Sequence, residues 1–117
     1  MVRKVSEMET ELRHEMRGGK GDVSFLHAFR AHEMTAPCRL CATLTLEPGC
    51  SIGDHAHDGE DEVYYILSGT GRVYDDGEWK TVTAGDAVLT GNGASHSIEN
   101  IGEEPLKLFA VVAKYSN

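Results

Sequence analysis

Long apolar runs are missing from this sequence of 117 residues. The longest apolar stretch, residues 106–113, is interrupted by Lys107 and is far shorter than the roughly 20 residues that span a bilayer. Residues 1–11 alternate charged and polar side chains and lack the apolar segment of a signal peptide. We therefore expect a soluble, cytoplasmic protein that does not enter membranes.

Basic residues are also scarce relative to acidic ones. The chain has 11 Lys and Arg against 19 Asp and Glu, a formal net charge of −8. An acidic surface repels phosphate backbones and anionic lipids, so nucleic acid and membrane surfaces are poor partners for this chain. The simplest interpretation of the charge is solubility.

Cysteines are few, and their spacing argues against a disulfide or a zinc finger. The three are Cys38, Cys41 and Cys50, and the first two form a Cys-x-x-Cys pair. Residues 38–46 alternate as a strand does, which separates the Cα atoms of Cys38 and Cys41 by roughly 10 Å, beyond the roughly 7 Å that a disulfide allows. No second Cys or His pair follows at zinc-finger spacing. We expect reduced, structural thiols.

The rest of the sequence indicates one all-β domain. The length suits a single domain, and the chain shows neither a fixed repeat nor a low-complexity linker. Short β-like runs are separated by Gly, Pro, Asn and Asp, and Asp76-Gly77 has the form of a hairpin turn. This pattern predicts a sandwich or barrel. The predicted strands are 23–29, 38–46, 51–57, 62–67, 71–74, 79–82, 87–90, 96–100 and 106–113.

An N-terminal arm, residues 1–22, precedes the barrel domain, residues 23–117. The segment from Ser6 to Glu9 has the form of a capping box, which predicts a short helix of one or two turns. Glycines at positions 18, 19 and 21 end any such helix.

His55, His57, Glu62 and His96 are the candidate metal ligands. His55 and His57 are two residues apart, so on a strand they point to the same face about 7 Å apart at Cα. Each of the four residues alone has a simpler interpretation, because surface histidines, solvated carboxylates and hydrogen-bonded core histidines are common. Their significance depends on the spacing of all four.

That spacing resembles the two sequence motifs of the cupin family. The first motif is matched by Gly49, five residues, His55-Ala56-His57, four residues, Glu62, six residues and Gly69. The second is matched by Gly85, five residues, Gly91-Asn92-Gly93, two residues, His96, three residues and Asn100. Gly91 stands where the second motif usually has proline, which puts the rigidity of that turn in doubt and leaves His96 unchanged.

The resemblance implies a double-stranded β-helix, the cupin jelly-roll barrel, with one metal ion in its mouth. Three imidazoles and one carboxylate suit a divalent manganese, iron, cobalt, nickel, copper or zinc ion, whereas calcium and magnesium prefer oxygen ligands. Four protein ligands on an octahedral ion leave two positions for water, dioxygen or a chelating substrate.

Two further residues are candidates for catalysis. Alternation places Tyr64 on the same face as Glu62, so its hydroxyl can donate a hydrogen bond or a proton to a ligand, although a core aromatic is an equally good interpretation. Arg72 can clamp a carboxylate if it faces the barrel, but the turn at 68–71 obscures its register. His14, His27 and His32 have no partner at ligand spacing and are expected on the surface.

The functional prediction is a metal-binding cupin that acts as an enzyme on a small carboxylate or enolizable substrate, as a dioxygenase, decarboxylase, isomerase or lyase. Oxalate decarboxylases in the family also need an acid beside the metal, and the sequence offers no convincing one. The alternative is a cupin that binds or senses a small ligand without turnover. We also expect a homodimer, with segments 2–5 and 23–29 contributing to the contact.

Overall fold

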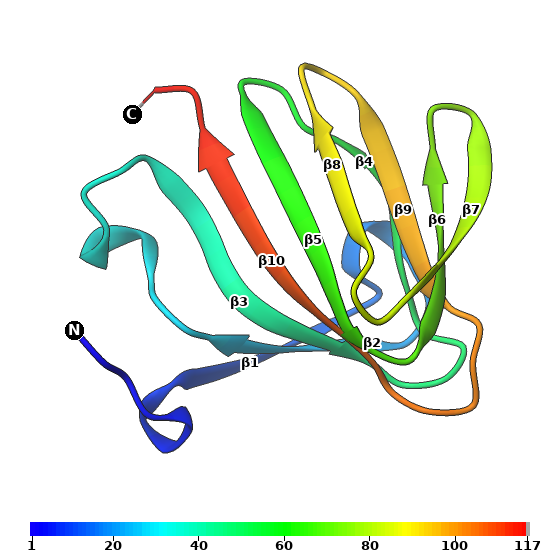
Figure 1. Cartoon of the computed structure of the whole chain (residues 1–117), viewed down its shortest axis with the longest axis horizontal. Helices are drawn as coiled ribbons and strands as arrows, with labels where there is room; N and C mark the ends of the chain where they lie inside the picture. The colour runs from blue at the N-terminus through cyan, green and yellow to red at the C-terminus, as the bar shows by residue number, and fades with distance from the viewer. Residues whose placement is uncertain (117) are drawn as a thin grey trace.

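Two antiparallel sheets form the structure, a computed structural model that describes residues 1–116 (Figure 1). The larger sheet has six strands in the order β1-β2-β3-β10-β5-β8, and the smaller has four in the order β4-β9-β6-β7. The strands are β1 (Glu9–His14), β2 (Asp22–His27), β3 (Cys38–Leu46), β4 (Ser51–Ala56), β5 (Glu60–Ser68), β6 (Thr70–Asp75), β7 (Glu78–Thr83), β8 (Ala87–Gly91), β9 (Ser95–Asn100) and β10 (Leu106–Lys114).

This all-β jelly roll is the predicted fold class. Each of the nine predicted strands is present, and no predicted end differs from the observed one by more than two residues. Within residues 1–116 the helical pieces are three 3-10 turns, η1 (Val5–Glu7), η2 (Met16–Gly18) and η3 (Ala31–Glu33). None of the helices in this part of the chain has the length and apolar character needed to cross a bilayer.

The N-terminal helix prediction is wrong. A single 3-10 turn forms at Val5–Glu7, where the Glu7 side chain accepts the Lys4 backbone N–H at 2.8 Å. Strand β1 follows at once and pairs with β2 along its whole length. The edge of β2 offers a ladder of backbone partners to an extended segment, and this ladder outweighs a weak local capping signal. Residues 1–22 therefore supply one strand of the larger sheet.

The core lies between the two sheets and is built from alternate residues of their strands. On β3 the inward residues Ala42, Leu44 and Leu46 are almost completely buried, as their alternation predicts. On β5 the inward set is Glu62, Tyr64 and Ile66. Burial of each large apolar side chain stabilises the fold by about 1.5–3 kcal/mol.

The hairpin turn and the reduced thiols are also as the sequence predicts. The predicted hairpin joins β6 to β7 through Asp76 and Gly77, with φ angles of 50° and 78° that suit a two-residue turn. The three cysteines are free thiols. Burial raises the pKa of Cys41, which disfavours a reactive thiolate and agrees with a structural role.

Candidate metal centre

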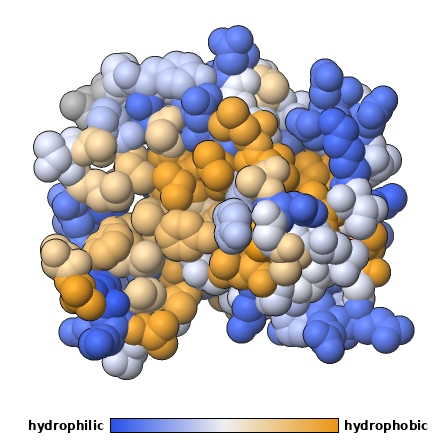
Figure 2. All heavy atoms as spheres, viewed as in Figure 1, coloured by the Kyte–Doolittle hydropathy of each residue, from blue (hydrophilic) through white to orange (hydrophobic). Residues whose placement is uncertain are grey.

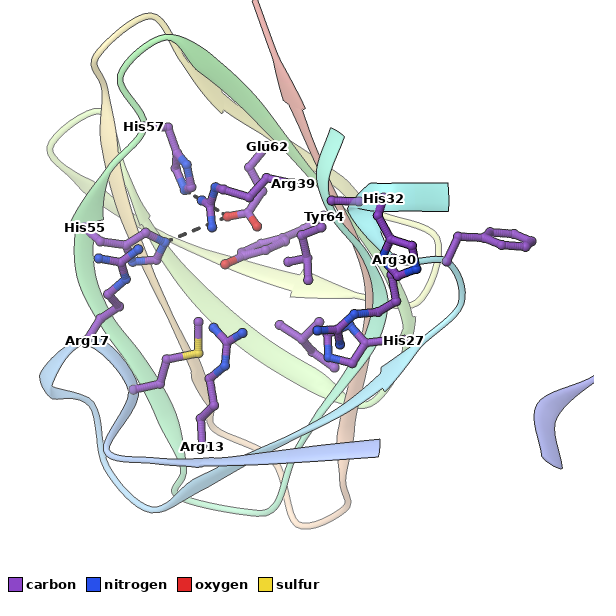
Figure 3. Close-up of a pocket in the computed structure, with 15 residues that line it drawn as sticks. Arg13, Arg17, His27, Arg30, His32, Arg39, His55, His57, Glu62 and Tyr64 are labelled. Atoms are coloured by element: carbon purple, nitrogen blue, oxygen red, sulfur yellow. Dashed lines mark ion pairs between the residues drawn. The ribbon is translucent and has the colours of Figure 1, made fainter. Parts of the chain in front are cut away.

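Four side chains from both sheets converge on one point: His55 of β4, His57 just beyond it, Glu62 of β5 and His96 of β9. Their ligand atoms all lie within 4.8 Å of one another. Glu62 Oε1 is 2.9 Å from His57 Nε2 and 3.0 Å from His96 Nε2, and His55 Nε2 is 3.0 Å from His96 Nε2. Figure 3 shows His55, His57 and Glu62 pointing toward one another. The structure thus brings together all four sequence-predicted ligands in a cluster consistent with a single metal site.

Strand pairing explains how residues far apart in the sequence meet. β4 and β9 are neighbours, and their register places His55 directly opposite His96. Beyond the end of β4, the His57 N–H still donates to the Ala94 carbonyl at 2.9 Å, which keeps His57 close to the β9 end of the ladder. Glu62 reaches the same point from the other sheet because it is an inward residue of β5.

Outer hydrogen bonds fix which ring nitrogen of His55 and of His57 faces the cluster. His55 Nδ1 donates to the Gly53 carbonyl at 2.7 Å, and His57 Nδ1 donates to the Glu60 carboxylate at 2.5 Å. A carbonyl and an ionised carboxylate only accept hydrogen bonds, so both Nδ1 atoms carry a proton. In the neutral rings, Nε2 of both histidines therefore presents a lone pair to the cluster.

The donor atoms of the cluster suit a cation. His57 Nε2 faces His96 Nε2 at 3.1 Å, and Glu62 Oε1 is buried without a hydrogen-bond partner among residues 1–116. Lone pairs and a carboxylate that face one another in a buried space repel unless positive charge lies between them. Ligand bonds of about 2.0–2.2 Å to one ion place neighbouring ligand atoms about 3 Å apart, close to the 2.9, 3.0 and 3.1 Å that separate the nearest atoms of His57, His96 and Glu62. The donor set and its spacing fit a transition-metal ion.

The protonation states suit metal binding as well. Burial raises the pKa of the Glu62 carboxyl, but the imidazoles of His55 and His96, when they carry a proton toward it, lower it more, and the pKa falls to about 2. Burial lowers the pKa of His96 below its usual value. An ionised carboxylate and a neutral imidazole are the forms that bind a metal ion.

A cavity of about 290 Å³ opens over the cluster. Its walls include His55, His57, Glu62 and Tyr64 (Figure 3). This volume lies at the lower end of the range for ligand pockets, so it suits a small molecule. Tyr64 stacks on the His96 ring at 4.9 Å between centroids. Burial raises the pKa of Tyr64 well above its usual value, and the negative charge of Glu62 raises it further, so the hydroxyl keeps its proton.

Comparison with known proteins identifies the family. The cupin domain family matches residues 42–112, more than half of the chain, including all four clustered residues. The chain belongs to the cupin family.

A named protein and a crystal structure from Thermotoga maritima are both similar to this cupin. A protein named oxalate-binding protein is 45% identical over 112 residues, which cover 96% of this chain and 93% of that protein. The crystal structure of a predicted oxalate decarboxylase has a TM-score of 0.93 at 44% identity and covers 97% of this chain and 99% of that one. A polyketide cyclase from Streptomyces resistomycificus, with a TM-score of 0.78 at 18% identity over 99% of this chain and 80% of that one, shows a shared fold alone.

Glu60 and Arg39 support the candidate metal ligands of this cupin and were not found from the sequence. Glu60 accepts the His57 Nδ1 proton and also binds Arg39, whose Nη2 is 2.7 Å away. The hydrogen bond from Arg39 lowers the pKa of Glu60 most. Burial raises the pKa and the hydrogen bond from His57 lowers it, and the result is a pKa of about 2. A carboxylate that orients a ligating histidine is a common outer partner in metal sites. A signal existed, because Glu60 shares the inward face of β5 with Glu62 two residues later.

Arg72 lies away from the cavity. It sits on β6 between the buried Gly71 and Val73, so its side chain points to the outer face of the smaller sheet. There it binds Glu99 at 2.9 Å, and its guanidinium lies 4.0 Å from the centre of the Trp79 ring. The structure therefore does not bring Arg72 together with the four clustered residues.

Two of the remaining histidines also line the cavity. His27 was expected on the surface, and this is wrong, because only 5% of it is exposed. It follows Val23 and Phe25 on the inward face of β2, stacks on Phe25, and its Nε2 lies 2.8 Å from Glu11. His32 is exposed as expected, but it too lines the cavity.

Proposed function

We propose that this cupin is an enzyme that holds one divalent transition-metal ion with His55, His57, Glu62 and His96 and acts on a small carboxylate or enolizable molecule. The convergence of imidazole nitrogens on a buried carboxylate oxygen without a hydrogen-bond donor carries the proposal. Manganese, iron, cobalt, nickel, copper and zinc all accept this ligand set. Such an ion, when bound, acts as a Lewis acid that polarises a carboxylate or enolate.

The protein's own groups would bind and orient the substrate. The cavity is small, and among the residues that the structure describes its lining has Glu62 as the sole carboxylate beside four arginines. A bound divalent ion would outweigh the charge of Glu62, and this net positive charge favours a small anion. The Tyr64 hydroxyl lines the same cavity and keeps its proton, so it can donate a hydrogen bond to a substrate oxygen. Oxalate is the first molecule to test, because the names of the similar Thermotoga protein and of the similar Thermotoga structure both refer to it.

A second function, binding without turnover, is favoured by one observation. Decarboxylation of oxalate in this family needs an acid beside the metal, and in the described part of the cavity wall that acid is missing, since Glu62 is itself a ligand. The relative named for oxalate binding agrees with a binding role. In this alternative, Tyr64 would hold the ligand and transfer no proton.

The experiment compares wild type, Tyr64→Phe and Glu62→Gln, each incubated with metal and oxalate, diketones or flavonols. Carbon dioxide release, oxygen uptake and the metal's absorption spectrum are followed. Turnover by wild type that Glu62→Gln abolishes supports the enzyme. A spectral shift on oxalate addition without turnover of any substrate supports the binding alternative, and loss of neither signal in Glu62→Gln contradicts both.

We also infer that the chain forms a homodimer through the outer face of the larger sheet. Figure 2 shows an apolar patch over the centre of the face in view, where Figure 1 places β10, β5 and β8. The strand register aligns Val111, Val63 and Leu89 in one row, and Tyr65 and Leu67 are about half exposed beside them. An exposed patch of this kind marks a protein interface.

Light scattering at micromolar concentration should therefore give the mass of two chains, and Tyr65→Lys should give that of one. A monomeric wild type contradicts the inference.

Of the two segments expected to contribute to the dimer contact, 2–5 has the exposed side chains Val2 and Val5, whereas 23–29 buries Val23 and Phe25 in the core.

A further inference from the structure

Arg17 differs from the other arginines of the cavity. Arg13, Arg30 and Arg39 each have a carboxylate partner, at 2.8, 3.8 and 2.7 Å respectively. Within residues 1–116 no ion pair or side-chain hydrogen bond engages the guanidinium of Arg17, although Arg17 lines the same cavity. In Figure 3 its side chain extends from the N-terminal segment on the side of the cavity where His55 lies.

The backbone under Arg17 is held firmly in place. Arg17 lies in the turn η2 with φ 55° and ψ 29°, a left-handed conformation that non-glycine residues seldom adopt. Two glycines let this turn pack against β4: a Cβ on Gly53 would lie 2.0 Å from the Arg17 carbonyl oxygen, and one on Gly19 would lie 2.2 Å from the Ser51 carbonyl oxygen. Gly53 is two residues before His55, so the turn is docked directly beside a predicted ligand.

With a divalent ion bound, the site has a net positive charge. A divalent ion and the Glu62 carboxylate give a net charge of about +1, the imidazoles add none, and Arg17 adds one more. The other three cavity arginines are balanced by their own carboxylate partners. A dianion would neutralise this site, whereas a monoanion would leave Arg17 without a partner.

We propose that Arg17 binds the second anionic group of a metal-bound dianion, which makes this site selective for small dicarboxylates over monocarboxylates. The inference rests on the proposed function and adds a substrate class to it. A planar guanidinium can hold two carboxylate oxygens at once, and the rim position of Arg17 lets its side chain swing toward a ligand in the cavity. A hydrogen-bonded charge pair of this kind contributes enough for a change in affinity of roughly tenfold or more.

The test measures binding to protein loaded with cobalt(II), whose visible spectrum reports ligand exchange. Oxalate serves as the dianion and acetate as the monoanion. Arg17→Met should lower the oxalate affinity by roughly tenfold or more while the acetate affinity stays within about twofold, and Arg17→Lys should recover part of the loss. Lys20→Met is the matched control, because it removes the same charge from the same loop at a residue outside the cavity wall. Its oxalate affinity should equal that of wild type.

Cobalt affinity, measured by competition with a chelator, provides the readout that separates the two claims. It should be the same in wild type and Arg17→Met. If wild type takes up no cobalt, the proposed function fails and this inference fails with it. If wild type binds cobalt and oxalate and Arg17→Met binds oxalate equally well, or loses oxalate and acetate alike, this inference alone is overturned.

Discussion

Replacing Glu60 by leucine should weaken metal binding without altering a metal ligand. The carboxylate accepts the His57 Nδ1 proton at 2.5 Å, and His57 is only 1% exposed. Loss of the acceptor leaves a buried N–H unpaired, at a cost of about 1–3 kcal/mol. The ring can avoid this cost only by moving or by shifting its proton to Nε2, and either change removes the lone pair aimed at the ion. We expect the metal affinity to fall about 10-fold to 100-fold, or about 1.4–2.7 kcal/mol.

The assay is competition for metal between the protein and a chelator of known affinity, with circular dichroism to confirm that each variant is folded. Glu60→Gln keeps an acceptor oxygen and should lose less affinity than Glu60→Leu. Glu99→Leu is the matched control, because Glu99 also pairs with an arginine, Arg72, but on the outer face of the smaller sheet. Equal metal affinities for Glu60→Leu and Glu99→Leu would refute the reasoning that Glu60 positions His57.

Three further predictions concern the fold. Leu108 is completely buried, so Leu108→Ala should lower the free energy of unfolding by about 2–5 kcal/mol in denaturant titrations. The Arg3 guanidinium lowers the pKa of Glu33 from 4.5 to about 2. The stabilisation from ionised Glu33 is therefore complete when the pH is above the unfolded-state pKa of 4.5, and it is lost as the pH falls to about 2. Denaturation midpoints of wild type and Glu33→Gln should therefore differ at about pH 6 and converge near about pH 2. Gly53→Ala places a methyl group 2.0 Å from the Arg17 carbonyl oxygen, so the turn η2 must move and its amides should exchange faster with solvent than in wild type.

The sequence predicts the strands and the four clustered residues because both depend on local spacing. A period of two fixes which residues of β3 and β5 face inward, and the Asp76-Gly77 turn fixes the register of its hairpin. His55 and His57 share a strand face for the same reason. Strand β1 has no such signal, since its one large apolar residue, Leu12, is 64% exposed, and its pairing with β2 is a tertiary effect.

The positions of the arginines could be predicted from the sequence only in part. Arg17 reaches the cavity only because a turn in the N-terminal segment packs against β4, more than thirty residues later in the chain, and no periodicity encodes that contact. Arg72 had a usable signal, because the apolar Val73 next to it must face inward and so turns Arg72 outward. Glu60 had one as well, in its alternation with Glu62. Alternation along regular strands therefore carries a signal for which way a side chain faces, whereas the loops that cover the cavity carry none.

The metal content of the purified protein, produced without a histidine tag, tests the central claim most directly. Because all four positions of the cluster hold competent ligands that face one another, elemental analysis should find about one divalent transition-metal ion per chain. His96→Ala should lose most of it, whereas His14→Ala, a change at an exposed histidine outside the cavity wall, should retain it. A wild-type protein that carries no metal after growth in supplemented medium, and takes up none of the candidate ions on titration, would contradict the account.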